Sequence, residues 1–195
     1  MSTVKKLNSR NNAKSQIIVF VGEKLAGKEI AASFLIKKYK FTGFRFSKIL
    51  TDLLQRLHLP ITRVNEVALV GALRERFGGG VLAEVVKKEI IARGLKKVVI
   101  DGLRHPAEYE ILKTMPGFKL VYLTAPIKLR YARAIKRGEK VGEKNFSFEE
   151  FKHEEKLPTE IFIKRLGAKA KVKIVNDGTV EQMYDKLVKV VGISK

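Results

Sequence analysis

The chain of 195 residues contains no cysteine and no tryptophan. The lack of cysteine excludes a disulfide scaffold, a thiolate metal site and a cysteine nucleophile. Acidic residues are also scarce: 20 Asp and Glu stand against 40 Lys and Arg, which gives a formal net charge of +20 at pH 7. An excess of this size favours anionic partners, which include nucleotides, nucleic acid and membrane surfaces.

Long apolar runs are missing as well. No run approaches the ~20 residues that a membrane-spanning helix needs, and none resembles the apolar core of a secretory signal peptide. We therefore expect a cytoplasmic protein without a membrane partner, and we expect a monomer. Because 45% of the residues are hydrophobic and 31% are charged, the composition is typical of a globular protein. The length suits one domain.

The first 16 residues differ from the rest of the chain. They are polar, contain four basic residues and lack any acidic residue; the basic residues are Lys5, Lys6, Arg10 and Lys14. We interpret residues 1–16 as a flexible basic arm. The single folded domain then covers residues 17–195.

From residue 17 onward, short apolar segments alternate with longer amphipathic ones. The predicted strands are 17–21, 44–46, 98–100, 118–123 and 172–175. The predicted helices are 28–38, 47–57, 65–77, 81–93, 106–113, 126–137, 147–166 (interrupted by Pro158) and 179–191. This alternation predicts an α/β fold with a parallel sheet. Residues 47–94 are a candidate insertion, and the charged segment 138–156 is a candidate mobile flap.

The motif that carries chemistry is the segment from Gly22 to Lys28, Gly-Glu-Lys-Leu-Ala-Gly-Lys, which fits the pattern GxxxxGK. It directly follows the most strand-like run and opens a helical pattern, which is the arrangement of a P-loop. Backbone N–H groups and a helix N-terminus would surround a phosphate, and Lys28 would reach the outer phosphates. The residues assigned to nucleotide binding are Gly22, Glu23, Lys24, Ala26, Gly27, Lys28 and Glu29. A tight turn with a solvated lysine is the less favoured alternative.

Glu29 follows the motif where P-loop proteins usually carry a Ser or Thr ligand for Mg²⁺. Its carboxylate could bind the metal, directly or through water, or it could turn away and leave the ion to other groups. A carboxylate near a triphosphate is repulsive unless a cation lies between them. Lys24 could offset part of that repulsion, or it could be a solvated side chain.

Asp101 and Arg104 follow the third predicted strand. In an open parallel sheet the ligand crevice lies at the carboxyl ends of the strands, so Asp101 should face the same crevice as the P-loop. We expect Asp101 to hold Mg²⁺ through water or to accept a proton, and Arg104 to bind an acceptor phosphate. The alternative is that Asp101 caps the next helix and Arg104 is a surface charge.

Three arginines follow the fourth predicted strand. Arg133 and Arg137 are four residues apart and share one helix face beside the candidate flap, so both can stabilise a phosphoryl group in transfer. Arg130 is expected on a solvated helix face. The acidic pairs 149–150 and 154–155 are also expected to form a solvated face.

From residue 17 to residue 191 the chain resembles the P-loop nucleotide kinases, in particular the nucleoside monophosphate kinase and dephospho-CoA kinase group. The matching segments are 22–28, Phe46-Ser47, 73–78 with Arg74, 101–104, Arg133 with Arg137, 148–151 and 176–178. The resemblance implies a P-loop three-layer αβα sandwich with a five-stranded parallel sheet. It also implies an acceptor-binding helical insertion at about 47–94 and an arginine-bearing lid at about 138–156.

The function implied by the resemblance is ATP-dependent transfer of the γ-phosphoryl group to a nucleotide or nucleotide-like acceptor, with ATP and Mg²⁺ bound. A nucleoside or deoxynucleoside monophosphate is the favoured acceptor, and dephospho-CoA is the second candidate. The implied catalytic residues are Lys28, Asp101, Arg133 and Arg137. The implied acceptor-binding residues are Ser47, Arg74, Asp101 and Arg104. Asn176 and Gly178 would lie beside the donor base, and Arg133 would contact the donor nucleotide. Glu29 and Asp101 would be the metal ligands.

Two further positions depart from this group. Dephospho-CoA kinases carry an Asp pair after the second strand, where residues 46–48 read Phe-Ser-Lys, and relatives often carry Arg-Asp where this chain has Lys152-His153. Glu29 and the large surplus of lysines leave a second interpretation open: a catalytically weak P-loop protein that binds nucleotides or nucleic acid. A nucleic-acid partner is the less favoured of the two, because no basic stretch is interleaved with aromatic residues.

Overall fold

The computed structural model describes residues 15–137, 147–157 and 160–192. Five strands form one parallel sheet in the order β2-β3-β1-β4-β5. The strands are β1 (Gln16–Val21), β2 (Thr42–Arg45), β3 (Lys97–Asp101), β4 (Phe118–Thr124) and β5 (Val172–Val175). The predicted α/β fold with a five-stranded parallel sheet is confirmed.

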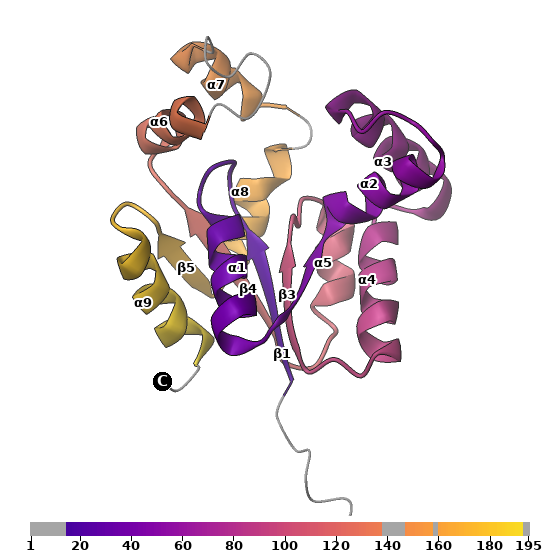
Figure 1. Cartoon of the computed structure of the whole chain (residues 1–195), viewed down its shortest axis with the longest axis horizontal. Coiled ribbons are helices and arrows are strands. Elements are labelled where there is room, and N and C mark those ends of the chain that lie inside the picture. Colours follow the sequence, from indigo (N-terminus) through magenta and orange to yellow (C-terminus); the bar gives the residue numbers. More distant parts are fainter. Residues whose placement is uncertain (1–14, 138–146, 158–159, 193–195) are drawn as a thin grey trace, which may run out of the picture.

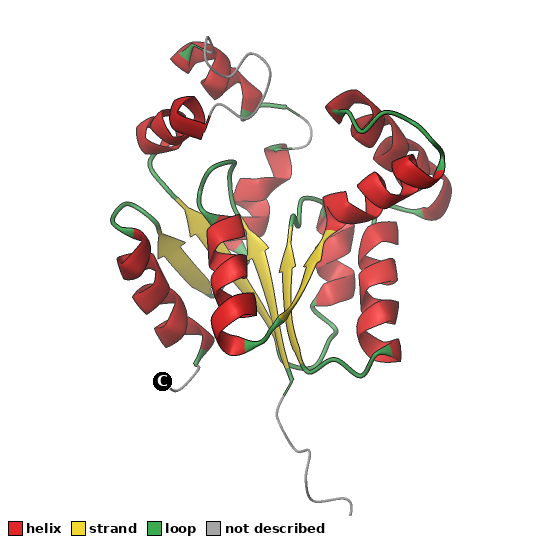
Figure 2. Ribbon diagram, in the orientation of Figure 1, coloured by secondary structure: helices red, strands yellow, loops and turns green. Residues whose placement is uncertain are grey.

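Helices cover both faces of the sheet and make the three layers seen in Figures 1 and 2. The helices are α1 (Lys28–Tyr39), α2 (Phe46–Arg56), α3 (Arg63–Phe77), α4 (Val81–Ala92), α5 (Pro106–Leu112), α6 (Ile127–Arg137), α7 (Phe148–Glu154), α8 (Ile161–Ala168) and α9 (Val180–Val191). Residues of α1 and α9 share one hydrophobic cluster, and residues of α4, α5 and α8 share the other. Among the described residues, no helix is long and apolar enough to span a membrane.

Strand β1 lies at the centre because its sequence is apolar on both faces. Ile17, Val19 and Val21 pack into the cluster with α4, α5 and α8. Ile18 and Phe20 pack into the cluster with α1 and α9. Successive side chains of a strand point to opposite faces, so a continuous apolar run is the pattern of a strand buried on both sides.

Within the predicted insertion 47–94, the part that projects from the sheet is the pair α2 and α3 (Figure 1). Helix α3 has no buried residue. By contrast, α4 contributes Leu82, Val86 and Ile90 to the main core. The projecting pair ends at the breaker Gly78-Gly79-Gly80, after which the chain returns to the sheet with α4.

One element prediction differs from the structure. The sequence predicts Phe46 at the end of the second strand, but this residue opens α2, and its side chain is buried in the core. The predicted helical stretch 147–166, with its interruption at Pro158, is two helices, α7 and α8, which residues 155–160 separate. The predicted arm lies outside the described residues up to residue 14, and the predicted flap does so over residues 138–146.

Candidate active site

The P-loop joins β1 to α1 at the carboxyl edge of the sheet, and close neighbours explain two of its glycines. A Cβ on Gly22 would lie 1.9 Å from the backbone oxygen of Leu123 in β4. At Gly27, where φ is 102°, a Cβ would lie 2.4 Å from Nδ2 of Asn176. The same amide donates a hydrogen bond to the Ala26 oxygen at 2.9 Å. The loop therefore fits closely against β4 and the segment after β5.

Lys28 is the first residue of α1, and its side chain reaches back into the loop. Nζ donates hydrogen bonds to the backbone oxygens of Gly22 and Glu23, each at 2.8 Å. Burial lowers the pKa of Lys28, and the nearby Asp101 carboxylate opposes this shift. An ammonium group held beside inward-facing backbone amides can bind the outer phosphates of a nucleotide.

A cleft of about 1370 Å³ opens beside Lys28. It brings together most of the side chains that the sequence predicts for the site. These are Lys24, Gly27, Lys28, Glu29, Ser47, Arg74, Asp101, Arg104, Arg133, Arg137, Asn176 and Gly178. Three residues of the P-loop itself, Gly22, Glu23 and Ala26, are buried and do not line the cleft. They can therefore contribute to phosphate binding only through their backbone.

Asp101 ends β3, and its carboxylate faces the cleft. Its Oδ1 atom is buried and has no hydrogen-bond partner among the described residues. Its Oδ2 atom lies 3.8 Å from Nε of Arg45, which ends β2 in register with Asp101. Arg45 also binds Glu29, with Nη2 2.8 Å from Oε1, and this hydrogen bond raises the pKa of Arg45. Arg45 therefore links the two carboxylates that the sequence predicts as metal ligands.

Arg74 and Arg104 also line the cleft, and each is held by a buried carboxylate. Nη2 of Arg74 donates to Oε1 of Glu108 at 2.8 Å, and Nη1 of Arg104 binds Oε1 of Glu160. The side chains of Glu108 and Glu160 are only 1% and 6% exposed. The expected alternative of Arg104 as a surface charge is therefore wrong, because its guanidinium is partly buried in an ion pair.

Glu108 links α3 to the loop after β3. In addition to binding Arg74, it accepts hydrogen bonds at Oε2 from the backbone N–H groups of Arg104, at 3.1 Å, and His105, at 3.0 Å. His105 is the N-cap of α5 and forms a capping box with Glu108. One buried carboxylate thus fixes the loop that carries Arg104 and the helix that carries Arg74.

Arg133 lies behind the P-loop and joins it to the segment after β5. Its Nη1 donates to the Leu25 oxygen at 3.1 Å, and its Nη2 donates to the Asn176 oxygen at 3.0 Å. Burial lowers the pKa of Arg133, and the neighbouring Arg130 lowers it further. The predicted donor-side residues Arg133 and Asn176 therefore contact each other and the loop, while Arg137 lines the cleft one helical turn further along α6.

Arg130 and the second acidic pair do not form the solvated face that the sequence suggests. Arg130 is 4% exposed; its Nε donates to the Ala125 oxygen at 2.9 Å, and its Nη1 binds Glu155. Glu154 binds Nζ of Lys24 at 2.5 Å. The interpretation of Lys24 as a solvated side chain is also wrong. These two ion pairs attach α7 to the P-loop and to α6.

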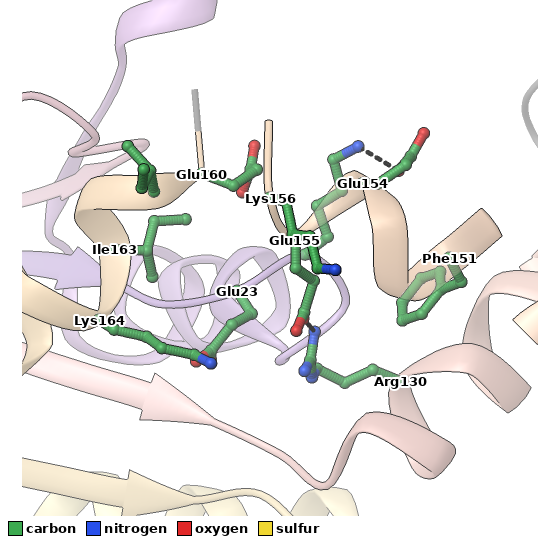
Figure 3. Close-up of a pocket in the computed structure, with 11 residues that line it drawn as sticks. Glu23, Arg130, Phe151, Glu154, Glu155, Lys156, Glu160, Ile163 and Lys164 are labelled. Carbon is green, nitrogen blue, oxygen red and sulfur yellow. Dashed lines mark hydrogen bonds and ion pairs between the residues drawn. The ribbon is translucent and has the colours of Figure 1, made fainter. Parts of the chain in front are cut away.

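A second cavity, of about 270 Å³, lies between the P-loop, α7 and α8. Figure 3 shows Glu155 pointing toward Arg130, and it places Glu23 and Lys164 on the same side of the cavity. Glu23 is 7% exposed, and its Oε1 accepts a hydrogen bond from the Tyr122 hydroxyl. Burial and this hydrogen bond raise the pKa of Tyr122 to about 12. The side chain of Glu23 thus points away from the phosphate-binding face of the loop.

Three functional candidates do not follow from the sequence predictions: Arg45, Glu108 and Glu160. A signal for Arg45 existed, because a residue that ends a strand beside β3 must lie at the same edge as Asp101. A signal for Glu108 also existed, since a Glu three residues after an N-cap is the capping-box pattern. Glu160 gives no local signal, because its partner Arg104 is 56 residues away along the chain.

The chain has partial sequence relatives. No protein-family model matches it. A UPF0200 protein of Sulfurisphaera tokodaii is 30% identical over 115 residues, which cover 58% of this chain and 62% of that protein. A UPF0200 protein of Methanosarcina mazei is 31% identical over 125 residues, which cover 63% of this chain and 66% of that protein. The matched part therefore spans less than two thirds of the length of these relatives.

Solved structures of low sequence identity share the fold along most of the chain. TT1252 from Thermus thermophilus has a TM-score of 0.61 at 16% identity, with 93% of this chain and 100% of that chain covered. A shikimate kinase from Acinetobacter baumannii has a TM-score of 0.54 at 14% sequence identity, and the match covers 91% of this chain and 94% of that chain. A dephospho-CoA kinase from Campylobacter jejuni has a TM-score of 0.53 at 16% sequence identity, and the match covers 90% of this chain and 95% of that chain. The fold is therefore that of the P-loop kinases.

Proposed function

We propose that this protein is a P-loop phosphotransferase, which moves the γ-phosphoryl group of ATP to a nucleotide or nucleotide-like acceptor. The observation that carries the proposal is the content of one cleft. Lys28, Asp101, Arg74 and Arg104 all line it. Lys28 and Asp101 would act on the donor, and Arg74 and Arg104 would bind the acceptor. Phosphoryl transfer depends mainly on positioning and on electrostatic stabilisation of the phosphate oxygens, and this arrangement supplies both.

The donor triphosphate would bind across the N-terminus of α1. Backbone N–H groups of the P-loop and the helix dipole would hold the inner phosphates, while Lys28 would exchange its bonds to two backbone oxygens for the outer phosphates. The donor base would lie beside Asn176 and Gly178, which line that end of the cleft. Arg137 on α6 would add positive charge near the transferring group.

The carboxylates of the cleft fit Mg²⁺, which prefers oxygen ligands. The orphaned Oδ1 of Asp101 supports this assignment, because a buried carboxylate oxygen without a partner is costly. Asp101 would hold the metal, and Glu29 would join it after release from Arg45. Bound Mg²⁺ would neutralise charge on the β- and γ-phosphates. Among the described residues, no group of three or more Asp, Glu and His side chains could hold a metal ion.

The acceptor side favours an anionic acceptor. Arg45, Arg74 and Arg104 present guanidinium groups to the cleft, and Ser47, the second residue of α2, also lines it. An acceptor oxygen would attack Pγ as the bond between Pγ and the β,γ-bridging oxygen breaks, so that ADP leaves. A phosphate oxygen of a nucleoside monophosphate needs no base for this attack. A hydroxyl group, as in dephospho-CoA, would transfer its proton to Asp101.

The test is an acceptor panel with the full chain, ATP and Mg²⁺. It includes ribo- and deoxynucleoside monophosphates and dephospho-CoA, with shikimate and gluconate as controls that offer a hydroxyl group but no nucleotide. Coupled ADP release gives the rate, and mass spectrometry identifies the phosphorylated acceptor. We expect turnover with at least one nucleotide acceptor and a loss of at least about 100-fold in the Lys28→Ala variant. No acceptor-dependent turnover, or an unimpaired Lys28→Ala variant, overturns the proposal.

The contact between Arg45 and Glu29 favours a second candidate function, that of a nucleotide-binding protein with weak or no transfer. In this case Arg45 stays on both carboxylates and takes the place of a divalent cation. Titration calorimetry with ATP separates the two functions. Binding of ATP that is unaffected by Mg²⁺, together with no turnover across the acceptor panel, supports the second candidate.

A further inference from the structure

The edge of the sheet opposite the cleft carries a concentration of positive charge that the cleft does not explain. Because all five strands are parallel, the connections that lead into them meet at this edge (Figure 1). Four segments that span these connections and the adjoining helix or strand ends, residues 37–41, 93–97, 113–119 and 169–173, contain eleven Lys or Arg residues and no Asp or Glu. These four segments are called the basal edge below.

Neighbouring acids and helix ends account for part of this charge. Lys113 and Lys169 both bind Glu110, and Arg93 binds Glu89. Basic residues in the last turn of a helix also complement the helix dipole. Seven lysine side chains are exposed and have no ion pair or hydrogen bond within the parts of the chain that the structure describes: Lys37, Lys38, Lys40, Lys96, Lys97, Lys171 and Lys173. Lys37 and Lys38 lie in the last turn of α1, and Lys173 lies over the ring of Tyr122. The four that remain are Lys40, Lys96, Lys97 and Lys171.

These four lysines follow the width of the sheet. Lys40 precedes β2, Lys96 and Lys97 lead into β3, and Lys171 precedes β5. The order β2-β3-β1-β4-β5 places β2 and β5 at the two ends. With neighbouring strands about 4.8 Å apart, the row extends over roughly 19 Å. A row of cations on one line matches a linear polyanion better than it matches a compact anion such as a nucleotide.

The basic arm joins the fold at the same edge. The backbone N–H of Gln16 donates to the oxygen of Lys96 at 2.7 Å, and Gln16 lies in register with Lys97. Residue 16 therefore lies beside the middle of the row.

We propose that the basal edge binds the phosphate backbone of duplex nucleic acid. Lysines neutralise phosphates and release counterions without reading the bases, so the binding is not sequence-specific. Single strands are usually bound on aromatic side chains, and none of the described residues of the basal edge is an exposed aromatic. The surface lies at the opposite end of the strands from the cleft, so this inference does not depend on the phosphotransferase activity.

The test measures fluorescence anisotropy of short, mixed-sequence DNA and RNA duplexes with the full chain, without ATP, over a range of KCl concentrations. The test variant carries Lys40→Gln, Lys96→Gln, Lys97→Gln and Lys171→Gln. The control variant carries the same number of substitutions at exposed lysines from α6 to α8: Lys128→Gln, Lys136→Gln, Lys156→Gln and Lys164→Gln. Circular dichroism checks that both variants stay folded. The two variants have the same net charge, so they separate position from total charge.

We expect the test variant to bind about tenfold or more weakly than the parent. Its slope of log K against log salt should become shallower by about 0.9 for each phosphate that the variant no longer neutralises. The control variant should keep its affinity within about twofold. DNA and RNA duplexes should behave alike if only the phosphate backbone is bound. Three results overturn the proposal: no duplex binding at low salt, equal weakening in both variants, or stronger binding to anionic lipid vesicles than to either duplex.

Discussion

At the scale of single residues, Lys28 is the side chain whose charge matters most. Burial lowers its pKa below the usual 10.5, so the folded protein binds this proton less tightly than the unfolded chain does. The charged form therefore costs stability below the lowered pKa, and the cost disappears as the pH rises from that pKa toward 10.5. A bound triphosphate would remove the cost at neutral pH by supplying the missing anion.

Replacing Lys28 with Met tests this interpretation. As the pH rises through the lowered pKa, the unfolding free energy of the parent should increase relative to that of Lys28→Met, because only the parent carries the titrating group. ATP should raise the melting temperature of the parent and not that of the variant. Urea unfolding at several pH values and thermal melts with ATP measure both effects. A stability difference that is flat with pH would contradict the assignment.

Gly27 offers a second prediction at this scale. Its φ is 102°, and a Cβ at this position would lie 2.4 Å from the Asn176 amide nitrogen, so the site has no room for a side chain. Gly27→Ala should lower the unfolding free energy by about 2 kcal/mol or more. The matched control is Gly71→Ala in α3, where a Cβ would meet nothing within 4 Å; it should raise stability by up to about 1 kcal/mol. Equal effects of the two substitutions would show that the P-loop does not fit against Asn176 as described.

At the scale of elements, the buried Glu108 connects α3, α5 and the loop after β3. Glu108→Gln keeps the shape but removes the charge that faces Arg74, so the unfolding free energy should fall by about 2 kcal/mol or more. The exposed Glu110 lies two residues further along the chain, and Glu110→Gln should leave stability unchanged. Denaturant unfolding of both variants checks this. A Glu108→Gln variant as stable as the parent would mean that the three contacts do not act together.

The sequence predicts elements well where the signal is local. The run from Ile17 to Val21 marks the central strand, and the glycines with Lys28 mark the turn into α1. Phe46 shows the limit: an apolar residue after a short strand fits a strand or a helix start equally well, and its packing into the main core decides the outcome. The separation of α7 from α8, by contrast, has a local signal, because Pro158 interrupts the predicted helical stretch 147–166.

The sequence predicts the site where one motif contains it, and it fails where two distant segments must meet. Lys28 and Asp101 follow from strand ends in a parallel sheet. Arg45 acts in the site through the pairing of β2 with β3, which no local pattern shows. Arg130 looks solvated in the sequence because its partner Glu155 lies 25 residues away.

At the scale of the whole molecule, the excess of 20 positive charges should weaken the fold through self-repulsion. Raising KCl from low to physiological concentration screens this repulsion, so the melting temperature should rise. Surface ion pairs such as Arg93–Glu89 act in the opposite direction but contribute little. Thermal melts across a KCl series measure the net effect. A melting temperature that falls with salt would mean that attraction between charges outweighs repulsion in this chain.

The whole molecule also has two separate cationic regions, at opposite ends of the same strands. Arginines line the cleft, and the basal edge presents lysines to solvent. Arginine binds phosphate in a fixed planar geometry, whereas lysine acts as a mobile point charge. The composition alone gives only the total charge. The parallel sheet divides this charge between the cleft, which we propose binds small phosphorylated molecules, and the basal edge, which we propose binds a polyanion.

The central claim is that donor and acceptor meet in one cleft around Lys28 and Arg104. The most direct measurement is the rate of ADP formation from ATP with and without a nucleoside monophosphate, in the parent, Lys28→Met and Arg104→Ala. We predict that the acceptor raises the parent's rate at least about tenfold and that either substitution removes this increase. An ADP rate that is independent of every acceptor, or that survives both substitutions, would contradict the claim.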